Sequence, residues 1–268
     1  MPGFPVTAGK VMEICSKASV NPPNLNRVIS LDPVLTGKLF QLVNYVYCGS
    51  DTHITSIEKA ITMLGVNTVK NLVLSASVSG AQMKDSELNM EDFWRHCLCV
   101  GVTSKLLAAK QGIDARYREE YFTAGLLHDI GKLPLNAVLP QDYMRAVASA
   151  DSKHKPLFEA ERESFGINHS DAGAMAANLW KLERPVTDAI SYHHDINGYS
   201  GSNLHIICNV AAANYFSIVN GAGFAGDRMP VKPDKKVWTT TGLNEDSFEE
   251  LKEKIFKEIE KANIFLRI

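Results

Sequence analysis

The segment Gly125-Leu126-Leu127-His128-Asp129-Ile130-Gly131-Lys132 is the most informative part of this chain. In it, an adjacent histidine and aspartate follow an apolar run that a purely structural helix would continue. Burying a carboxylate beside an imidazole is costly unless another group pairs with both, and a divalent metal ion is a natural partner. Neighbouring side chains on a helix point about 100° apart, so both can reach one ion only if it lies close to the backbone.

The bulk composition is that of an ordinary globular protein. Of the 268 residues, 45% are hydrophobic and 22% are charged, which allows one large domain or two small ones with a substantial core. A net charge of -2 provides no basic surface for nucleic acid or for an anionic membrane. No apolar run is long enough to span a bilayer. We therefore expect neither a membrane nor a nucleic acid as partner.

The first residues and the cysteines predict a cytoplasmic protein. Met1 to Pro5 lack the basic and apolar regions of a signal peptide. The five cysteines form no C-x-x-C pair, and their number is odd. Reduced thiols in the cytoplasm are the simplest interpretation.

Capping signals predict helices along nearly the whole chain. Thr55 followed by Glu58 is a capping-box pattern, and Gly65 ends the short helix that it opens. Asn67 can cap the next helix, and Asn89 begins a long one. Each of these helices carries apolar residues at helical spacing.

The later segments continue the helical pattern. Gly112 closes the long helix, and Pro185 suits the first turn of a helix that runs to His193 and His194. Strand alternation is weak throughout the chain. We therefore predict an all-α protein with about a dozen helices, given typical helix lengths.

Polarity along the chain predicts three parts. The polar segment Met83–Asn89 is the best candidate for a boundary. We predict an N-terminal helical subdomain over residues 1–85, a helical bundle with a histidine cluster over residues 86–222, and a loop with a C-terminal amphipathic helix over residues 223–268. The apolar face of this last helix consists of Phe248, Leu251, Ile255 and Ile259.

Five histidines share a similar context, and with Asp129 they are candidate metal ligands. A single histidine on an apolar helix face is more often a core residue with a satisfied hydrogen bond. Several of them on successive helices, together with a buried aspartate, make a metal site an equal alternative. Imidazole and carboxylate ligands suit iron, manganese, zinc or nickel better than magnesium or calcium. The five are His96, His128, His169, His193 and His194, whereas His53, His154 and His205 are assigned to the surface or to packing.

The order of these histidines resembles the HD superfamily of metal-dependent phosphohydrolases, and the flanking segments resemble its HDOD family (HD-related output domain). The similarity extends over roughly residues 5 to 222 and includes many separate motifs in the same order. The motifs are Leu31-Asp32-Pro33, Leu42-Val43-Asn44, Ser56-Ile57-Glu58-Lys59-Ala60-Ile61, Leu64-Gly65, Phe93-Trp94-Arg95-His96, Ala124 to Lys132, and Trp180 to His194.

The resemblance implies an HD-like helical bundle in a bacterial signal-transduction module that binds a transition metal and is not catalytic. Iron or manganese is the expected metal, zinc and nickel are alternatives, and the family also allows a module with no metal. HD phosphohydrolases complete their ligand set with an aspartate on a later helix, where this chain has Asn214. A neutral amide is a much weaker ligand than a carboxylate, which argues against catalysis.

The alternative function is a metal-dependent phosphohydrolase acting on a nucleotide or cyclic dinucleotide. In that case Asp129 and Lys132 are the catalytic residues: the metal activates a water molecule, and the lysine assists the phosphate. The simpler interpretation of Lys132 is that it lies at a helix end and interacts with the C-terminal dipole of that helix. His169, His193 and His194 resemble the additional ligands of the HD-GYP family, whose full signature this chain lacks.

Two expectations concern the partner. A regulatory module of this kind is expected to act on a separate signalling protein or to bind a small nucleotide, since the sequence leaves no room for a second signalling domain. A third hypothesis is an adaptor whose histidines are only core residues, which needs neither metal nor substrate. The sequence does not predict the oligomeric state.

Overall fold

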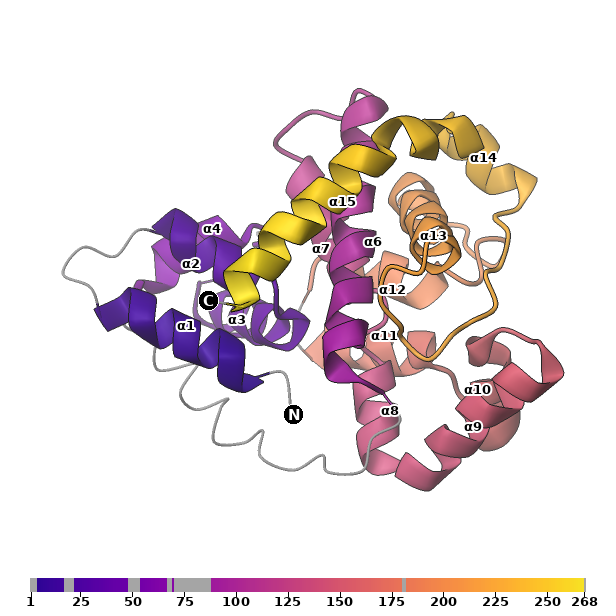
Figure 1. Cartoon of the computed structure of the whole chain (residues 1–268). Helices are drawn as coiled ribbons and strands as arrows, with labels where there is room; N and C mark the ends of the chain where they lie inside the picture. Colours follow the sequence, from indigo (N-terminus) through magenta and orange to yellow (C-terminus); the bar gives the residue numbers. More distant parts are fainter. Residues whose placement is uncertain are drawn as a thin grey trace.

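The computed structural model describes residues 4–16, 22–47, 54–66, 69, 88–179 and 182–267 (Figure 1). These residues form helices and no strand, which confirms the predicted all-α class. The helices are α1 (Phe4–Ser16), α2 (Pro22–Ile29), α3 (Pro33–Tyr47), α4 (Ile57–Leu64), α6 (Met90–Lys110), α7 (Arg118–Leu127), α8 (Lys132–Val138), α9 (Pro140–Lys153), α10 (Leu157–Phe165), α11 (His169–Leu179), α12 (Arg184–Tyr192), α13 (Leu204–Val219), α14 (Lys235–Thr241) and α15 (Glu245–Arg267).

Helix α6 forms the axis of the molecule and packs against α7, α13 and α15 (Figure 1). It begins where the sequence predicts, because the side-chain oxygen of Asn89 accepts a hydrogen bond from the backbone N–H of Asp92 at 3.2 Å. Gly112, with φ of 77°, follows its C-terminal end. A positive φ is readily available only to glycine, so the predicted end is also confirmed.

The N-terminal helices confirm some of the predicted caps and correct one. Helix α4 is capped by Ser56, whose hydroxyl accepts a hydrogen bond from the N–H of Lys59 at 3.3 Å. The cap is therefore one residue later than the Thr55 that the sequence indicates. Gly65 ends this helix as predicted, with φ of 77°. The helix predicted after Asn67, the boundary at residue 85 and Trp180 lie outside the described residues.

The N-terminal helices share one apolar core with the middle of the chain. Their buried side chains pack together with residues of α6, of α7, of α8 and of the segment that joins α7 to α8. This segment contains His128 and Asp129, so the N-terminal helices pack against the part of the chain that carries two candidate ligands. Representative members are Leu25, Leu39, Phe40, Ile61, Phe93, Leu126, Ile130 and Leu133.

The C-terminal segment forms the predicted amphipathic helix and one further element. On α15, Phe248, Ile255 and Ile259 are buried and Leu251 is half-buried. Helix α15 crosses α6 and reaches α1 and α2 (Figure 1). Within the predicted loop the chain forms α14, which the sequence analysis did not predict.

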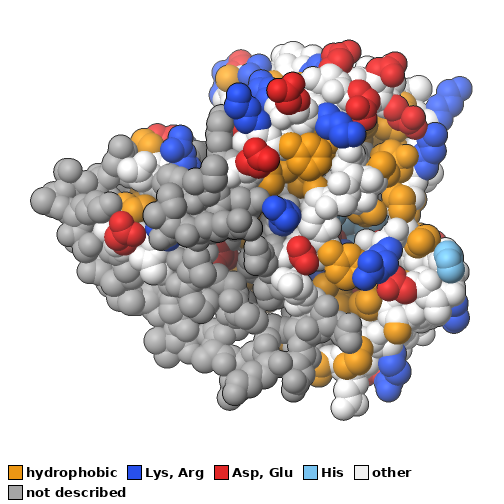
Figure 2. Space-filling view, in the orientation of Figure 1, with side chains coloured by type: hydrophobic (Ala, Val, Ile, Leu, Met, Phe, Trp, Pro, Cys, Tyr) orange, Lys and Arg blue, Asp and Glu red, His pale blue; other side chains and the backbone are white. Residues whose placement is uncertain are grey.

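The visible surface carries no continuous patch of one charge. Lys and Arg side chains are interspersed with Asp and Glu side chains over the described part of the face in Figure 2. This distribution agrees with the near-zero net charge. Among the described residues, none of the helices combines the length and the apolar character that crossing a bilayer requires.

Candidate metal centre

The crossing of α6 and α7 brings the first two ligand candidates together. A Cβ on Gly125 of α7 would lie 2.7 Å from the carbonyl oxygen of Val100 on α6, so only glycine allows this close contact. As a result, His96 from α6 and His128 at the end of α7 have ring centroids 5.3 Å apart.

His128 and Asp129 lie in a tight turn between α7 and α8 rather than within a helix, which corrects the sequence prediction. The N–H of Ile130 bonds to the carbonyl of Leu127 at 3.0 Å, and the N–H of Lys132 bonds to that of Asp129 at 3.0 Å. These tightened i+3 bonds differ from regular α-helical pairing. The turn lets adjacent side chains converge, with Nε2 of His128 3.3 Å from Oδ2 of Asp129.

Gly131 lets this turn contact the start of α11. A Cβ at residue 131 would lie 2.0 Å from the carbonyl oxygen of His169 and 2.4 Å from the backbone nitrogen of Gly173. Backbone atoms cannot move aside as a flexible side chain can. The absence of a side chain here therefore determines how closely Asp129 approaches His169.

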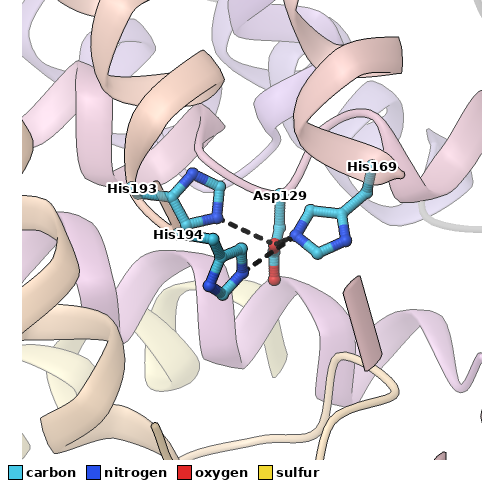
Figure 3. Close-up of side chains that lie close together, drawn as sticks. All are labelled: Asp129, His169, His193 and His194. Atoms are coloured by element: carbon cyan, nitrogen blue, oxygen red, sulfur yellow. Dashed lines mark hydrogen bonds and ion pairs between the residues drawn. The ribbon is translucent and has the colours of Figure 1, made fainter. Parts of the chain in front are cut away.

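Asp129 lies at the centre of the cluster, and both of its carboxylate oxygens face histidines. Oδ2 is 3.4 Å from Nε2 of His96 and 3.3 Å from Nε2 of His128. Oδ1 is 3.2 Å from Nε2 of His169 and 3.9 Å from Nε2 of His193 (Figure 3). The carboxylate thus links two groups of donors, one on each side of it.

His194 completes the second group. Its Nε2 lies 3.1 Å from Nε2 of His169 (Figure 3), and its ring stacks on Phe158 with centroids 4.3 Å apart. Helix α12 ends at Tyr192, so His193 and His194 follow the helix instead of closing it as predicted. The structure brings together all six predicted metal ligands: His96, His128, Asp129, His169, His193 and His194.

Backbone carbonyls orient two of the imidazole rings. Nδ1 of His128 bonds to the carbonyl of Gly125 at 2.8 Å, and Nδ1 of His193 bonds to that of Ile190 at 2.9 Å. A carbonyl can only accept, so in both rings Nδ1 is the donor. The lone pair of each Nε2 is consequently left for another partner inside the cluster.

Two side chains outside the predicted set orient two further rings. Oε2 of Glu161 on α10 accepts a hydrogen bond from Nδ1 of His169 at 2.6 Å. The hydroxyl of Ser217 on α13 lies 3.1 Å from Nδ1 of His96. A carboxylate behind a histidine makes that ring a stronger metal ligand. The sequence analysis missed both residues.

Burial keeps most of this cluster uncharged apart from the carboxylate. Burial lowers the pKa of His96 to about 4 and those of His193 and His194 well below their ordinary value. These rings are neutral at pH 7, the form that binds metals. Burial opposes ionisation of Asp129, but His128 and Lys132 outweigh it and hold the pKa of that carboxyl well below its usual range.

The donor set fits a transition metal ion. Ligand atoms about 2.1 Å from a tetrahedral or octahedral ion lie about 3.0–3.4 Å apart, and four of the contacts given above fall in that range. The Nε2 atoms of His96, His128 and His193 and Oδ1 of Asp129 are buried without a hydrogen-bond partner. Buried polar atoms are normally paired, so these unpaired atoms indicate a site for an ion.

Lys132 does not lie at a helix C-terminus, so the dipole interpretation is wrong. It is the first residue of α8 and is 2% exposed. Its ammonium donates to Oδ2 of Asp129 at 2.7 Å. Burial lowers the pKa of Lys132, but the charge of Asp129, followed by those of Asp227 and Glu161, raises it above the ordinary value. This cation therefore lies directly beside the candidate metal site.

An adjoining cleft of ≈ 430 Å³ gives access to the cluster. Its lining includes His96 and His194 from the cluster, Lys132, Asn214 of α13, and Asp227 of the loop that follows α13. Asn214 lies on α13, where the sequence analysis expects the last ligand, and is 7% exposed with an unpartnered Oδ1. It is outside the two groups of candidate donors found among the described residues.

The chain matches one domain family and one curated relative. The model of the HDOD domain family matches residues 1–196. A curated protein of Treponema pallidum (strain Nichols) is 25% identical over 215 residues, which are 79% of this chain and 41% of that protein. This chain therefore spans less than half the length of that relative.

Solved structures share the fold. The MmoQ response regulator of Methylococcus capsulatus has a TM-score of 0.70 and 23% identity, with 91% of this chain and 94% of that chain covered. An HDOD domain protein of Geobacter sulfurreducens has a TM-score of 0.58 and 21% identity over 98% and 93% of the two chains. A candidate phosphohydrolase of Shewanella amazonensis has a TM-score of 0.55 and 21% identity over 100% and 94%.

Proposed function

This chain belongs to the HDOD family, and we propose that it is a signal-transduction module organised around a bound transition metal and without catalytic activity. The observation that carries this proposal is the convergence of five buried histidines and Asp129 from separate elements with unpaired donor atoms. An ion at this site would link α6, the α7–α8 turn, the start of α11 and the end of α12. Metal occupancy would then control how these elements are held together.

Such a module transmits information if the bound and free states differ in shape or rigidity. A ligand stabilises the state that binds it more tightly, so metal or nucleotide occupancy shifts the population of the two states. We propose a separate signalling protein or a small nucleotide as the partner, and the cytoplasm as the location. The described cysteines Cys15, Cys97, Cys99 and Cys208 carry free thiols, which suits a reducing compartment.

Iron or manganese is the metal that we propose first, with zinc and nickel as alternatives. Metal analysis of the purified protein and of His128→Ala tests the site. We expect a stoichiometric transition metal in the natural protein and its loss in the variant. An adaptor with histidines that serve only in the core would contain no metal and would show the same result for both proteins.

His154→Asn is the matched control for that experiment. His154 is exposed and has φ of 52°, a conformation that asparagine tolerates better than alanine. The variant therefore removes one imidazole without straining the backbone. It should retain the full metal content.

A metal-dependent phosphohydrolase is the second candidate, and Lys132 favours it. A buried ammonium beside the candidate metal site, at the wall of a cleft, is placed to bind a phosphate oxygen. A divalent ion held by His128 and Asp129 would supply the positive charge that activates water and neutralises a phosphoester. A screen of nucleotides and cyclic dinucleotides with added Mn²⁺ or Fe²⁺ separates the candidates. Turnover by the natural protein would overturn the non-catalytic proposal.

A further inference from the structure

The loop between α13 and α14 lines the cleft that adjoins the cluster. The N–H of Phe224 donates to the carbonyl of Asp92 in α6 at 3.1 Å. Gly223 has φ of 81°, and a Cβ there would lie 2.3 Å from the same carbonyl oxygen. The loop backbone thus contacts α6 one turn before His96. All of these loop residues follow the segment that the family model matches.

Asp227 in this loop is a fixed, buried carboxylate. Its Oδ2 accepts a hydrogen bond from the N–H of Leu157 at 3.2 Å, and its Oδ1 accepts one from the N–H of Met229 at 2.9 Å. The residue is 9% exposed. Leu157 begins α10, the helix that carries Glu161, so Asp227 joins the loop to the second carboxylate of the site.

Asp227 and a neutral amide, that of Asn214, line the same cleft, together with Lys132 and His194. The Oδ1 atom of Asn214 is buried and has no hydrogen-bond partner. Asn214 contributes no charge to the cleft. Burial raises the pKa of Asp227, whereas the nearby charge of Lys132 opposes this rise. Asp227 in turn raises the pKa of Lys132.

The formal charges around the cluster explain why this carboxylate matters. Asp129 and Glu161 are buried acidic residues with a formal charge of -1 each, and Lys132 is a buried basic residue with a formal charge of +1. These three leave one net negative charge, which is half of what a divalent cation requires. With Asp227 the balance becomes two negative charges. An ion in a low-dielectric site is stable only when such charges are compensated.

We propose that Asp227 is a positioning residue for the metal centre, and that it supplies from the loop the negative charge that Asn214 does not supply from α13. This inference rests on the proposed function, because it assumes that a divalent ion binds to the histidine cluster. Asp227 acts through the Lys132 ammonium and through the charge of the cleft. Neutralising it should weaken metal binding even though the loop keeps its shape.

The competing explanation is that Asp227 only anchors the loop through its two backbone hydrogen bonds. Two substitutions separate the explanations. Asp227→Asn removes the charge but keeps one oxygen that can accept from a backbone N–H. Asp227→Glu keeps the charge but lengthens the side chain, which disturbs both bonds. If the charge of Asp227 matters, only Asp227→Asn should bind the metal weakly. If Asp227 only anchors the loop, Asp227→Glu should lose more metal affinity than Asp227→Asn.

Isothermal titration of the chelator-stripped full chain with Mn²⁺ is the test. We expect Asp227→Asn to raise the dissociation constant by about tenfold or more, the usual effect of losing a group behind the ligands. The dissociation constant of Asp227→Glu should stay within about threefold of that of the natural protein. This change is smaller than the usual effect of losing a group behind the ligands. Asp246→Asn, which removes an exposed carboxylate at the start of α15, is the control and should have no effect. Adding Asn214→Asp to Asp227→Asn should restore binding.

Unchanged Mn²⁺ affinity in Asp227→Asn would overturn this inference while leaving the proposed metal site intact. A loss of affinity in Asp227→Glu as large as in Asp227→Asn would also overturn it. If the natural protein itself binds no Mn²⁺, both the inference and the proposed function fail. Thermal unfolding of each variant shows whether it is folded, and the double variant provides the readout if Asp227→Asn alone is unstable.

Discussion

Oε2 of Glu161 lies 2.6 Å from Nδ1 of His169, and both side chains are fully buried. The same oxygen also accepts the backbone N–H of His169 at 2.8 Å. The carboxylate therefore fixes both the ring and the start of α11. It also directs the Nε2 lone pair of His169 toward Asp129 and His194.

Glu161→Gln tests this orientation. The amide is similar in size but lacks the charge that strengthens the imidazole as a ligand. We expect Mn²⁺ affinity to fall by about 10- to 100-fold, as is typical for such partners, measured by titration calorimetry. Glu163→Gln on the exposed face of the same helix is the control. Equal affinities for the two variants would show that Glu161 serves folding alone.

Gly131→Ala tests the contact between the turn and α11. The added Cβ would meet backbone atoms of His169 and Gly173 at 2.0 and 2.4 Å. We expect the free energy of unfolding to fall by about 3 kcal/mol, at the upper end for overpacking, and metal affinity to fall with it. Urea unfolding of the metal-free protein measures the first effect.

Gly9→Ala is the matched control for that experiment. Gly9 lies in α1, and a Cβ there would have no atom within 4 Å. Alanine is the better helix former, so this variant should be more stable by up to about 1 kcal/mol. Opposite signs for the two variants would assign the loss in Gly131→Ala to the contact with α11 and not to the change of residue type.

Lys132→Met should change stability and metal affinity in opposite directions. In the metal-free protein the variant leaves the buried charge of Asp129 without its 2.7 Å partner, which costs about 3–5 kcal/mol. When the ion is bound, however, Lys132 is a neighbouring like charge, so its removal should tighten Mn²⁺ binding. Unfolding with and without Mn²⁺ measures both effects. Equal destabilisation in the two conditions would contradict a metal beside Lys132.

The sequence predicts the candidate ligands that the structure brings together better than it predicts the residues around them. Each histidine lies at a helix end or on an apolar face, so its context is local and visible in the sequence. The same holds for the start of α6 at Asn89 and its end near Gly112. Glu161 is separated from Leu157 by one helical turn on the buried face, and an acidic residue at that position is a signal that the sequence analysis missed.

Other features depend on contacts between distant segments, which no local pattern contains. Lys132 is buried where α8 meets a cleft that it shares with Asp227, a residue from a distant part of the chain. Similarly, the turn at His128 and Asp129 is tight because Gly131 meets α11. A helix and such a turn have the same sequence signature here, since both use right-handed backbone conformations, as the φ of -54° and ψ of -37° of His128 show.

The free energy of unfolding of the metal-free protein should fall as the pH is lowered from 6.5. Burial holds the pKa of His96 at about 4, against 6.5 for a free side chain, so between these values the unfolded chain binds a proton that the folded chain does not. Each such group lowers the free energy of unfolding by about 1.4 kcal/mol per pH unit. His193 and His194 shift in the same direction.

Urea unfolding in a chelating buffer at pH 7.5, 6.5 and 5.5 measures this dependence. We expect little change between the first two values and a clear loss between the last two. In His96→Gln, the number of protons taken up on unfolding in this pH range should fall by about one, and the free energy of unfolding should depend less steeply on pH. A free energy of unfolding that is constant down to pH 5.5 would mean that these rings are charged, or exposed, in the folded protein.

Asn214→Asp tests whether this module retains a decayed catalytic site. The new carboxylate would enter the cleft that contains Lys132 and His194, where the family resemblance expects the last metal ligand. We expect tighter Mn²⁺ binding and, with an activated phosphodiester as substrate, hydrolysis by the variant alone. Asn220→Asp, which adds the same charge at the end of α13 outside the cleft, should remain inactive. Hydrolysis by the natural protein at any metal load would instead make it an enzyme, because Asn214 would then be compatible with turnover.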